Sequence, residues 1–156
     1  MTSGIWAIVP VKEFSGAKQR LSGRFAPEFR RGLAAVMLED VLAALMSARG
    51  LAGVAVVTVD PVSDALARRM GASVLTAGAR DGHTGAVTAA IGVLAGEGAT
   101  GMLTIPGDVP GVTAAEIEAV LAAHGAAPAF TIVPAHDSRG SNVIVASPPG
   151  LVPLAF

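Results

Sequence analysis

The chain has 156 residues, of which 52% are hydrophobic and only 15% are charged, with a net charge of −1 and no cysteine. This length fits a single domain with a substantial core, the near-neutral charge argues against nucleic-acid binding, and the absence of cysteine excludes disulfides and thiolate metal sites. No apolar run approaches the ~20 residues of a spanning helix and no secretory signal pattern opens the chain, so we expect a cytoplasmic domain that does not enter a membrane.

Strand and helix patterns alternate along most of the chain. Runs typical of buried strands lie at 5–11, 53–59, 73–76 and 100–106. Helical spacing predicts helices over 27–48, 60–71, 83–98 and 113–125, with Asp60 as an N-cap of the second and Thr113 with Glu116 as a capping box on the fourth. The rhythm then changes to two strands, 128–135 and 141–147, which a short polar turn joins, and the Pro-rich end from 148 onward shows no sign of a helix.

This order of elements predicts one domain over residues 1–156, with a three-layer α/β/α architecture and a mostly parallel sheet. Right-handed crossovers bring the loops that follow parallel strands to one edge of the sheet, where ligands bind. Three of the loops expected at this edge have an unusual composition.

The first loop follows the first strand and is basic. Six of the eleven basic residues lie in the first fifth of the chain: Lys12, Lys18, Arg20, Arg24, Arg30 and Arg31. Such a local patch on a near-neutral protein suits a small polyanion, and its Lys and Arg side chains could hold a triphosphate by charge-assisted hydrogen bonds. The loop matches neither a P-loop nor a dinucleotide-binding glycine motif. The alternative is a solvated loop with scattered charges.

The second loop is "IPGDVPGV" after the strand at 100–106, where a rigid Val109-Pro110 turn would direct the Asp108 carboxylate off the sheet edge. A single carboxylate there could bind Mg²⁺ that also contacts substrate phosphates, or it could bond its own turn. The third loop is "HDSRGSNV", whose small polar residues could bind an acidic ligand or form an ordinary hairpin turn.

The histidines support no metal site. Their spacing matches no zinc motif. His124 is expected at a helix end, His136 in a turn, and His83 before a helix at the ligand-binding edge of the sheet. No G-x-S-x-G segment supplies a serine nucleophile.

Three segments taken together resemble one family: "IVPVKEFSGAKQRL", "GDVP" and "GSNVIVASPP", in that order and spacing. The family is the CofC/FbiD group of phospholactate or phosphoenolpyruvate guanylyltransferases of coenzyme F-420 biosynthesis. Its members have a nucleotidyltransferase fold of the GT-A-like, Rossmann-like kind. The resemblance runs from Ile5 to the end of the chain.

The resemblance implies an enzyme that joins GMP from GTP to a small phosphorylated carboxylic acid and releases pyrophosphate, with Mg²⁺ as cofactor. It implies that Lys12, Lys18 and Arg20 hold the triphosphate and that Asp108 binds the metal, these four forming the catalytic set. The nucleotide contacts would also include Pro10, Val11, His83, Thr84 and Gly107. The acid would contact Gly140, Ser141 and Asn142.

Two departures from the family pattern bear on these expectations. "GHTGAV" stands where many members have a "GLN"-type segment, and similar variants occur in members that use 3-phospho-D-glycerate, which makes this acid our first expectation ahead of phosphoenolpyruvate and 2-phospho-L-lactate. Members also usually continue with an "FG..S" segment and a further metal-binding Asp, so residues 1–156 are expected to lack the C-terminal part of the family fold.

Three further interpretations remain open at this point. The chain could be a nucleotidyltransferase for a sugar phosphate or molybdopterin, although those families begin with a Gly-rich loop where this chain has "VKEFSGAKQRL". It could be a non-catalytic α/β domain that binds a nucleotide or a partner. Its high hydrophobic content also allows a homodimer, because unpaired apolar surface commonly forms an interface.

Overall fold

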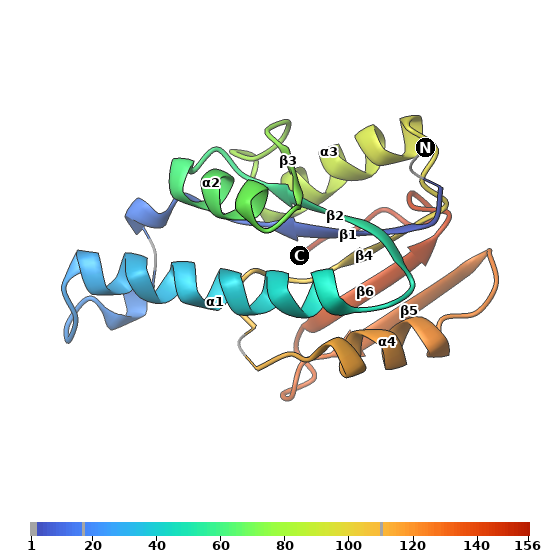
Figure 1. The fold of residues 1–156 in the computed structure, drawn as a ribbon. Helices are drawn as coiled ribbons and strands as arrows, with labels where there is room; N and C mark the ends of the chain where they lie inside the picture. The colour runs from blue at the N-terminus through green and yellow to red at the C-terminus, as the bar shows by residue number, and fades with distance from the viewer. Residues whose placement is uncertain (1–2, 17, 110) are drawn as a thin grey trace.

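A six-stranded sheet forms the centre of the molecule in a computed structural model, which describes residues 3–16, 18–109 and 111–156 (Figure 1). The order of strands across the sheet is β3-β2-β1-β4-β6-β5. In chain order the strands are β1 Ile5–Pro10, β2 Leu51–Val57, β3 Ser73–Leu75, β4 Gly101–Thr104, β5 Ala129–Pro134 and β6 Ser141–Ser147.

The sheet is mostly parallel, as predicted. β1 pairs in parallel with β2 and with β4, and β2 pairs in parallel with β3. β6 runs antiparallel to both of its neighbours, β4 and β5. The change of rhythm late in the sequence therefore marks a β5–β6 hairpin that adds its second strand to the parallel part of the sheet.

Four α-helices cover the two faces of this sheet: α1 Pro27–Ser47, α2 Pro61–Arg69, α3 Gly82–Gly96 and α4 Ala114–Ala123. Short 3-10 helices η1 Phe14–Gly16 and η2 Gln19–Leu21 lie in the loop after β1. The predicted end signals are present: Asp60 caps α2 by accepting from the backbone N–H of Ser63, and Thr113 and Glu116 form a capping box on α4.

Two hydrophobic clusters, one on each face of the sheet, confirm the three layers. Alternation along β1 separates them, because Ala7 and Val9 belong to the cluster that contains α1, α2 and α4 residues, whereas Ile8 belongs to the cluster that contains α3 residues. The central strand is therefore buried on both faces, which explains why its sequence is continuously apolar.

The observed strands differ from the expected ranges by a few residues. β2 begins at Leu51, two residues earlier than predicted, because Leu51 pairs with Ile5 at the start of β1. It also ends at Val57, since Thr58 and Val59 lead into the α2 cap: the Asp60 backbone N–H donates to the Thr58 hydroxyl at 3.0 Å. Over the described residues, no helix is both long and apolar enough to cross a membrane.

Candidate active site

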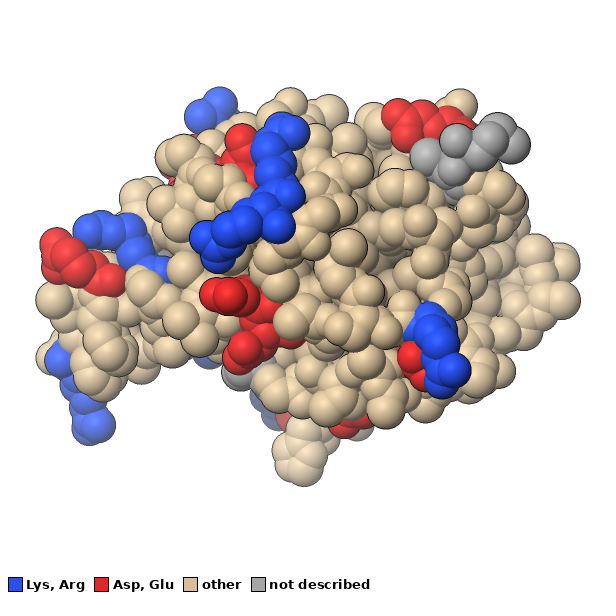
Figure 2. All heavy atoms as spheres, viewed as in Figure 1, with Lys and Arg blue, Asp and Glu red and all other residues tan. Residues whose placement is uncertain are grey.

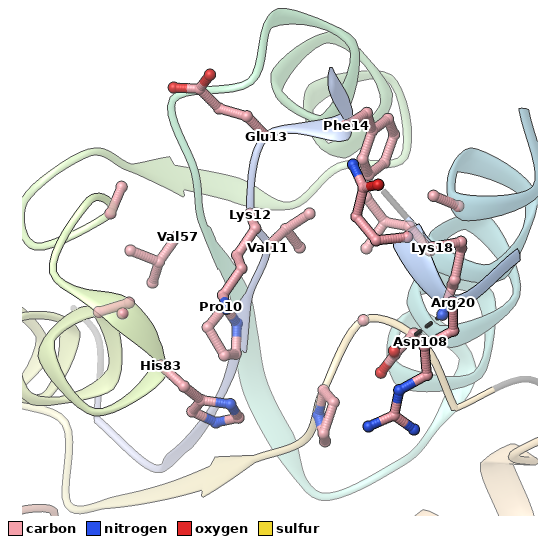
Figure 3. A pocket seen from close by; sticks show the side chains of 18 of the residues that line it. Pro10, Val11, Lys12, Glu13, Phe14, Lys18, Arg20, Val57, His83 and Asp108 are labelled. Atoms are coloured by element: carbon pink, nitrogen blue, oxygen red, sulfur yellow. Dashed lines mark hydrogen bonds and ion pairs between the residues drawn. The ribbon is translucent and has the colours of Figure 1, made fainter. Parts of the chain in front are cut away.

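The loops after β1 and β4 and the first turn of α3 meet at one edge of the sheet and enclose a cleft of about 610 Å³ (Figure 3). This is the edge that parallel topology predicts for ligand binding. Of the residues predicted to bind nucleotide or metal, those that line the cleft are Pro10, Val11, Lys12, Lys18, Arg20, His83, Gly107 and Asp108.

The basic loop forms the wall of the cleft nearest the start of α1. Lys12, Lys18 and Arg20 all line it, and Lys18 adopts a left-handed backbone conformation with φ of 52° just before η2. Arg24 is exposed and is absent from the cleft lining. Ala17, which lies in the predicted loop, falls outside the described residues.

Positive and negative groups are interspersed over this part of the surface. In Figure 2, Lys and Arg side chains lie at the left end of the molecule, near the start of α1, and in a separate group over α2, with acidic groups between them. One cleft-lining basic residue, Lys12, is followed by the acidic Glu13, which pairs with Arg80 at 3.4 Å. The basic patch is therefore local, which suits a small anion better than a long duplex.

Lys18 and Asp108 pair directly across the cleft. Lys18 Nζ lies 2.9 Å from Asp108 Oδ2, and the two side chains are 90 residues apart in sequence (Figure 3). The predicted phosphate-binding loop and the predicted metal-binding loop thus face each other at ion-pair distance. Pro110, part of the turn predicted to follow Asp108, lies outside the described residues.

Asp108 is chemically suited to hold Mg²⁺ together with a ligand's phosphates. Its side chain is 59% exposed at the cleft, so one carboxylate oxygen can reach a cation there while solvent or phosphate oxygens complete the coordination. Within the described ranges, no group of three or more His, Cys, Asp or Glu side chains is placed to bind a metal alone. The residues therefore fit a site that depends on substrate oxygens.

His83 lies at the start of α3, between the cleft and a second, smaller cavity of about 10 Å³. Its ring is 4.2 Å from the ring of Phe156. Burial lowers the pKa of His83 below its usual range; the charge of Lys12 lowers it further, and Asp108 acts in the opposite direction. These surroundings therefore favour the neutral form of the imidazole.

The other expected residue on α3, Thr84, lies outside the cleft lining. Its hydroxyl oxygen instead accepts a hydrogen bond from the Phe156 backbone N–H at 3.0 Å. This contact links residues 72 positions apart, and no sequence pattern pointed to it.

The segment "GSN" is divided by the structure. Ser141 and Asn142, at the start of β6, line the smaller cavity with His83, Thr104 and Phe156. Gly140 lies outside the lining of both cavities, at the end of the hairpin turn, where its carbonyl accepts from the Ala135 N–H at 2.9 Å. The two cavities share His83 and Pro106, so Ser141 and Asn142 lie next to the cleft.

Several residues at the site were missed from the sequence. Phe14 and Glu13 line the cleft within the loop already identified as basic, and Thr104 and Phe156 line the smaller cavity. Phe14 could have been found, since it is the apolar residue in the middle of a charged loop. Thr104 could also have been found, because it is the last residue of β4, a central strand of the sheet. Nothing in the sequence indicated Phe156.

The fold is that of solved nucleotidyltransferase structures. A solved structure of a candidate nucleotide-diphospho-sugar transferase from Desulfovibrio desulfuricans matches with a TM-score of 0.69 at 16% identity, covering 93% of this chain and 64% of that one. A solved structure of CMP:2-keto-3-deoxy-manno-octonic acid synthetase matches with a TM-score of 0.61 at 14% identity, covering 93% of this chain and 74% of that one.

Sequence comparison then identifies the family. Residues 5–154 match the model described as "Guanylyl transferase CofC like", so the chain belongs to this guanylyltransferase family and to the nucleotidyltransferase class of enzymes. A relative in Rubrobacter xylanophilus named phosphoenolpyruvate guanylyltransferase is 37% identical over 97% of this chain and 73% of that protein. A relative of the same name in Conexibacter woesei is 37% identical over 92% of this chain and 65% of that protein. The chain thus spans about two thirds to three quarters of the length of these relatives.

Proposed function

We propose that this chain transfers GMP from GTP to a small phosphorylated carboxylic acid and releases pyrophosphate. The observation that carries the proposal is the geometry of the edge, where a cleft with basic residues facing Asp108 adjoins a cavity formed by Ser141 and Asn142. A reaction that joins two phosphorylated substrates needs two adjacent binding regions. Because the smaller cavity, at about 10 Å³, has room for only about one water molecule, the acid would occupy the part of the cleft next to Ser141 and Asn142.

The triphosphate is expected to bind against the basic wall. Lys12, Lys18 and Arg20 line the cleft, Lys12 beside Pro10 and the other two beside Asp108 (Figure 3), and charged donors of this kind bind phosphate oxygens strongly where solvent is partly excluded. We expect Lys18 to leave Asp108, its partner at 2.9 Å, for the phosphates. Phosphate oxygens supply the replacement partner for the ammonium group.

The Asp108 carboxylate, once released by Lys18, would hold Mg²⁺. Bound there with the phosphates, the ion supplies positive charge that neutralises the reacting groups. Asp108 would orient this charge toward the cleft, and the neighbouring Lys18 and Arg20 would neutralise the departing pyrophosphate.

The chemical step needs no base from the protein. A phosphate oxygen of the acid attacks the α-phosphorus of GTP, a new P–O bond forms, and the bond to the β-phosphate oxygen breaks, so that pyrophosphate leaves with the electron pair. Because this phosphate is already ionised, alignment and charge neutralisation carry the reaction. A neutral His83 suits this mechanism, since its ring separates the two subsites without binding the attacking phosphate as a cation.

Ser141 and Asn142 are expected to bind the acid, by hydrogen bonds to its carboxylate or phosphate. Phosphoenolpyruvate is the first acid to test, because the relatives at 37% identity carry its name. The "GHTGAV" segment predicts 3-phospho-D-glycerate, and 2-phospho-L-lactate completes the set. A GDP-linked acid of this kind is the intermediate expected in coenzyme F-420 biosynthesis.

The test is a product panel. The chain is incubated with GTP, Mg²⁺ and each of the three acids in turn, pyrophosphate is measured continuously, and the GDP-linked product is identified by mass spectrometry. The proposal predicts pyrophosphate release that requires one of these acids. Folded protein that releases none with any of them, or that turns over only with a sugar phosphate or molybdopterin, contradicts it.

A further inference from the structure

One buried carboxylate near the site has no part in the mechanism above. Asp60 follows β2, is 6% exposed, and lies outside the residues that line the cleft. A buried carboxylate is costly unless hydrogen bonds satisfy its oxygens. The hydrogen-bond partners of Asp60 therefore indicate the role of this buried carboxylate.

One oxygen of Asp60 serves helix α2. Oδ2 accepts from the Ser63 backbone N–H at 2.8 Å and from the Ser63 hydroxyl at 2.9 Å. This is ordinary N-cap geometry, and a serine, threonine or asparagine at this position could supply it equally well. The cap alone does not require the second carboxylate oxygen.

The second oxygen reaches a distant segment. Oδ1 accepts from the backbone N–H of Phe14 at 3.0 Å, and Phe14 lies 46 residues earlier in the basic loop. Serine could cap the helix but is too short to reach this amide as well. The carboxylate thus ties the loop after β1 to the rigid junction between β2 and α2.

The position of this link within the loop connects it to the cleft. Phe14 lies between Lys12 and Lys18, the two lysines of the cleft wall, and its ring is buried in the core cluster with Ala34 and Leu38 of α1. The ring and the amide therefore hold the middle of the loop at two points. Loss of the amide link frees the backbone to turn about the ring, which moves the lysines on either side.

We propose that Asp60 is a positioning residue for nucleotide binding, holding the basic loop through the Phe14 amide so that Lys12 and Lys18 face the cleft. This inference rests on the proposed function, because it takes GTP as the ligand of that loop. It assigns Asp60 no contact with substrate.

The test compares a variant that loses the loop link with one that loses only the side-chain bond from Ser63 to Asp60. Asp60→Ser keeps an oxygen for the Ser63 N–H but loses the bond to Phe14, whereas Ser63→Ala removes a helix-side donor and leaves the bond to Phe14 in place. Hydrogen exchange of peptides from the loop and from α2 shows which link has opened. Titration calorimetry with GTP and Mg²⁺ measures the dissociation constant without requiring turnover.

Asp60→Ser is expected to speed exchange at the Phe14 amide and to weaken GTP binding by about tenfold, the size of effect typical of losing one charged hydrogen bond. Ser63→Ala should leave both at the wild-type value. Faster exchange at Phe14 with unchanged GTP affinity overturns the proposal, as does equal weakening by both variants. Wild-type protein that binds no GTP instead refutes the proposed function, while the exchange data still report the loop link.

Asp60→Asn provides a second route if Asp60→Ser does not fold. Asparagine has a single acceptor oxygen, so either the Phe14 or the Ser63 amide must lose its partner. The proposal requires GTP affinity to fall if exchange accelerates at Phe14 and to stay unchanged if it accelerates only at Ser63. The opposite pairing of results contradicts it.

Discussion

Asp108→Asn separates the catalytic role of this carboxylate from any structural one. The substitution keeps the shape of the side chain and removes its charge. In the structure that charge pairs with Lys18 at 2.9 Å, with side chains 22% and 59% exposed. Because partly exposed ion pairs contribute only about 0–1 kcal/mol, the free energy of unfolding should change by less than about 1 kcal/mol.

The expected loss of activity is much larger. If Asp108 holds the metal against the phosphates, its charge acts where negative charge moves in the transition state. Removing one preorganised electrostatic group typically lowers turnover by about 10²–10³-fold, equivalent to roughly 3–4 kcal/mol of barrier. The structure therefore predicts that Asp108→Asn reduces activity far more than it reduces stability.

Pyrophosphate release at saturating GTP and acid, together with urea unfolding, measures both quantities. Glu118→Gln is the matched control: it breaks an ion pair with Arg49 at 3.2 Å in which neither residue lines the cleft. This control should leave turnover unchanged. Asp108→Asn that retains more than about a tenth of wild-type turnover, or that loses more than about 3 kcal/mol of stability, would refute the reasoning.

Three further predictions concern other parts of the molecule. Lys12→Ala should raise the KM for GTP about tenfold, whereas Arg24→Ala, outside the cleft lining, should not change it; steady-state kinetics with both variants checks this. Asn142→Ala should raise the KM for the acid about tenfold and leave that for GTP within twofold, and the reverse pattern would contradict the acid subsite. Burial lowers the pKa of His124, so the unfolded state binds the proton more readily, and the stability of the fold should decrease as pH drops below the unfolded pKa near 6.5. His124→Gln should therefore make the melting temperature fall less between pH 8 and 5, and an unchanged pH dependence of the melting temperature would contradict this prediction.

The layers of the fold could be predicted because hydrophobic pattern determines them. The continuous apolar run of β1 reflects burial on both faces, and the cap residues of α2 and α4 mark where those helices begin. The position of β6 between β4 and β5 could not be read in the same way, since two late strands are equally consistent with several sheet orders. Strand order depends on contacts between segments far apart in the chain.

The part of the site that the sheet topology positions could be predicted from the sequence. Lys12 and Asp108 follow strands that are neighbours in a parallel sheet, so the fold itself brings their loops together. The contacts of Thr84 with Phe156 and of Asp60 with Phe14 carry no such signal, because each depends on side-chain or backbone geometry across 72 and 46 residues. From the sequence, Asp60 was predicted only as a helix cap, and its second hydrogen bond, from the Phe14 amide, was not predicted.

A crystal structure of the chain with GTP and Mg²⁺ tests the central claim most directly. The account predicts that Lys18 Nζ leaves Asp108 Oδ2, its partner at 2.9 Å in the free protein, and contacts a phosphate oxygen, while Asp108 contacts the metal. The triphosphate should lie between the basic loop and the loop after β4. A structure in which the Lys18–Asp108 pair is intact and the triphosphate lies elsewhere would contradict the account.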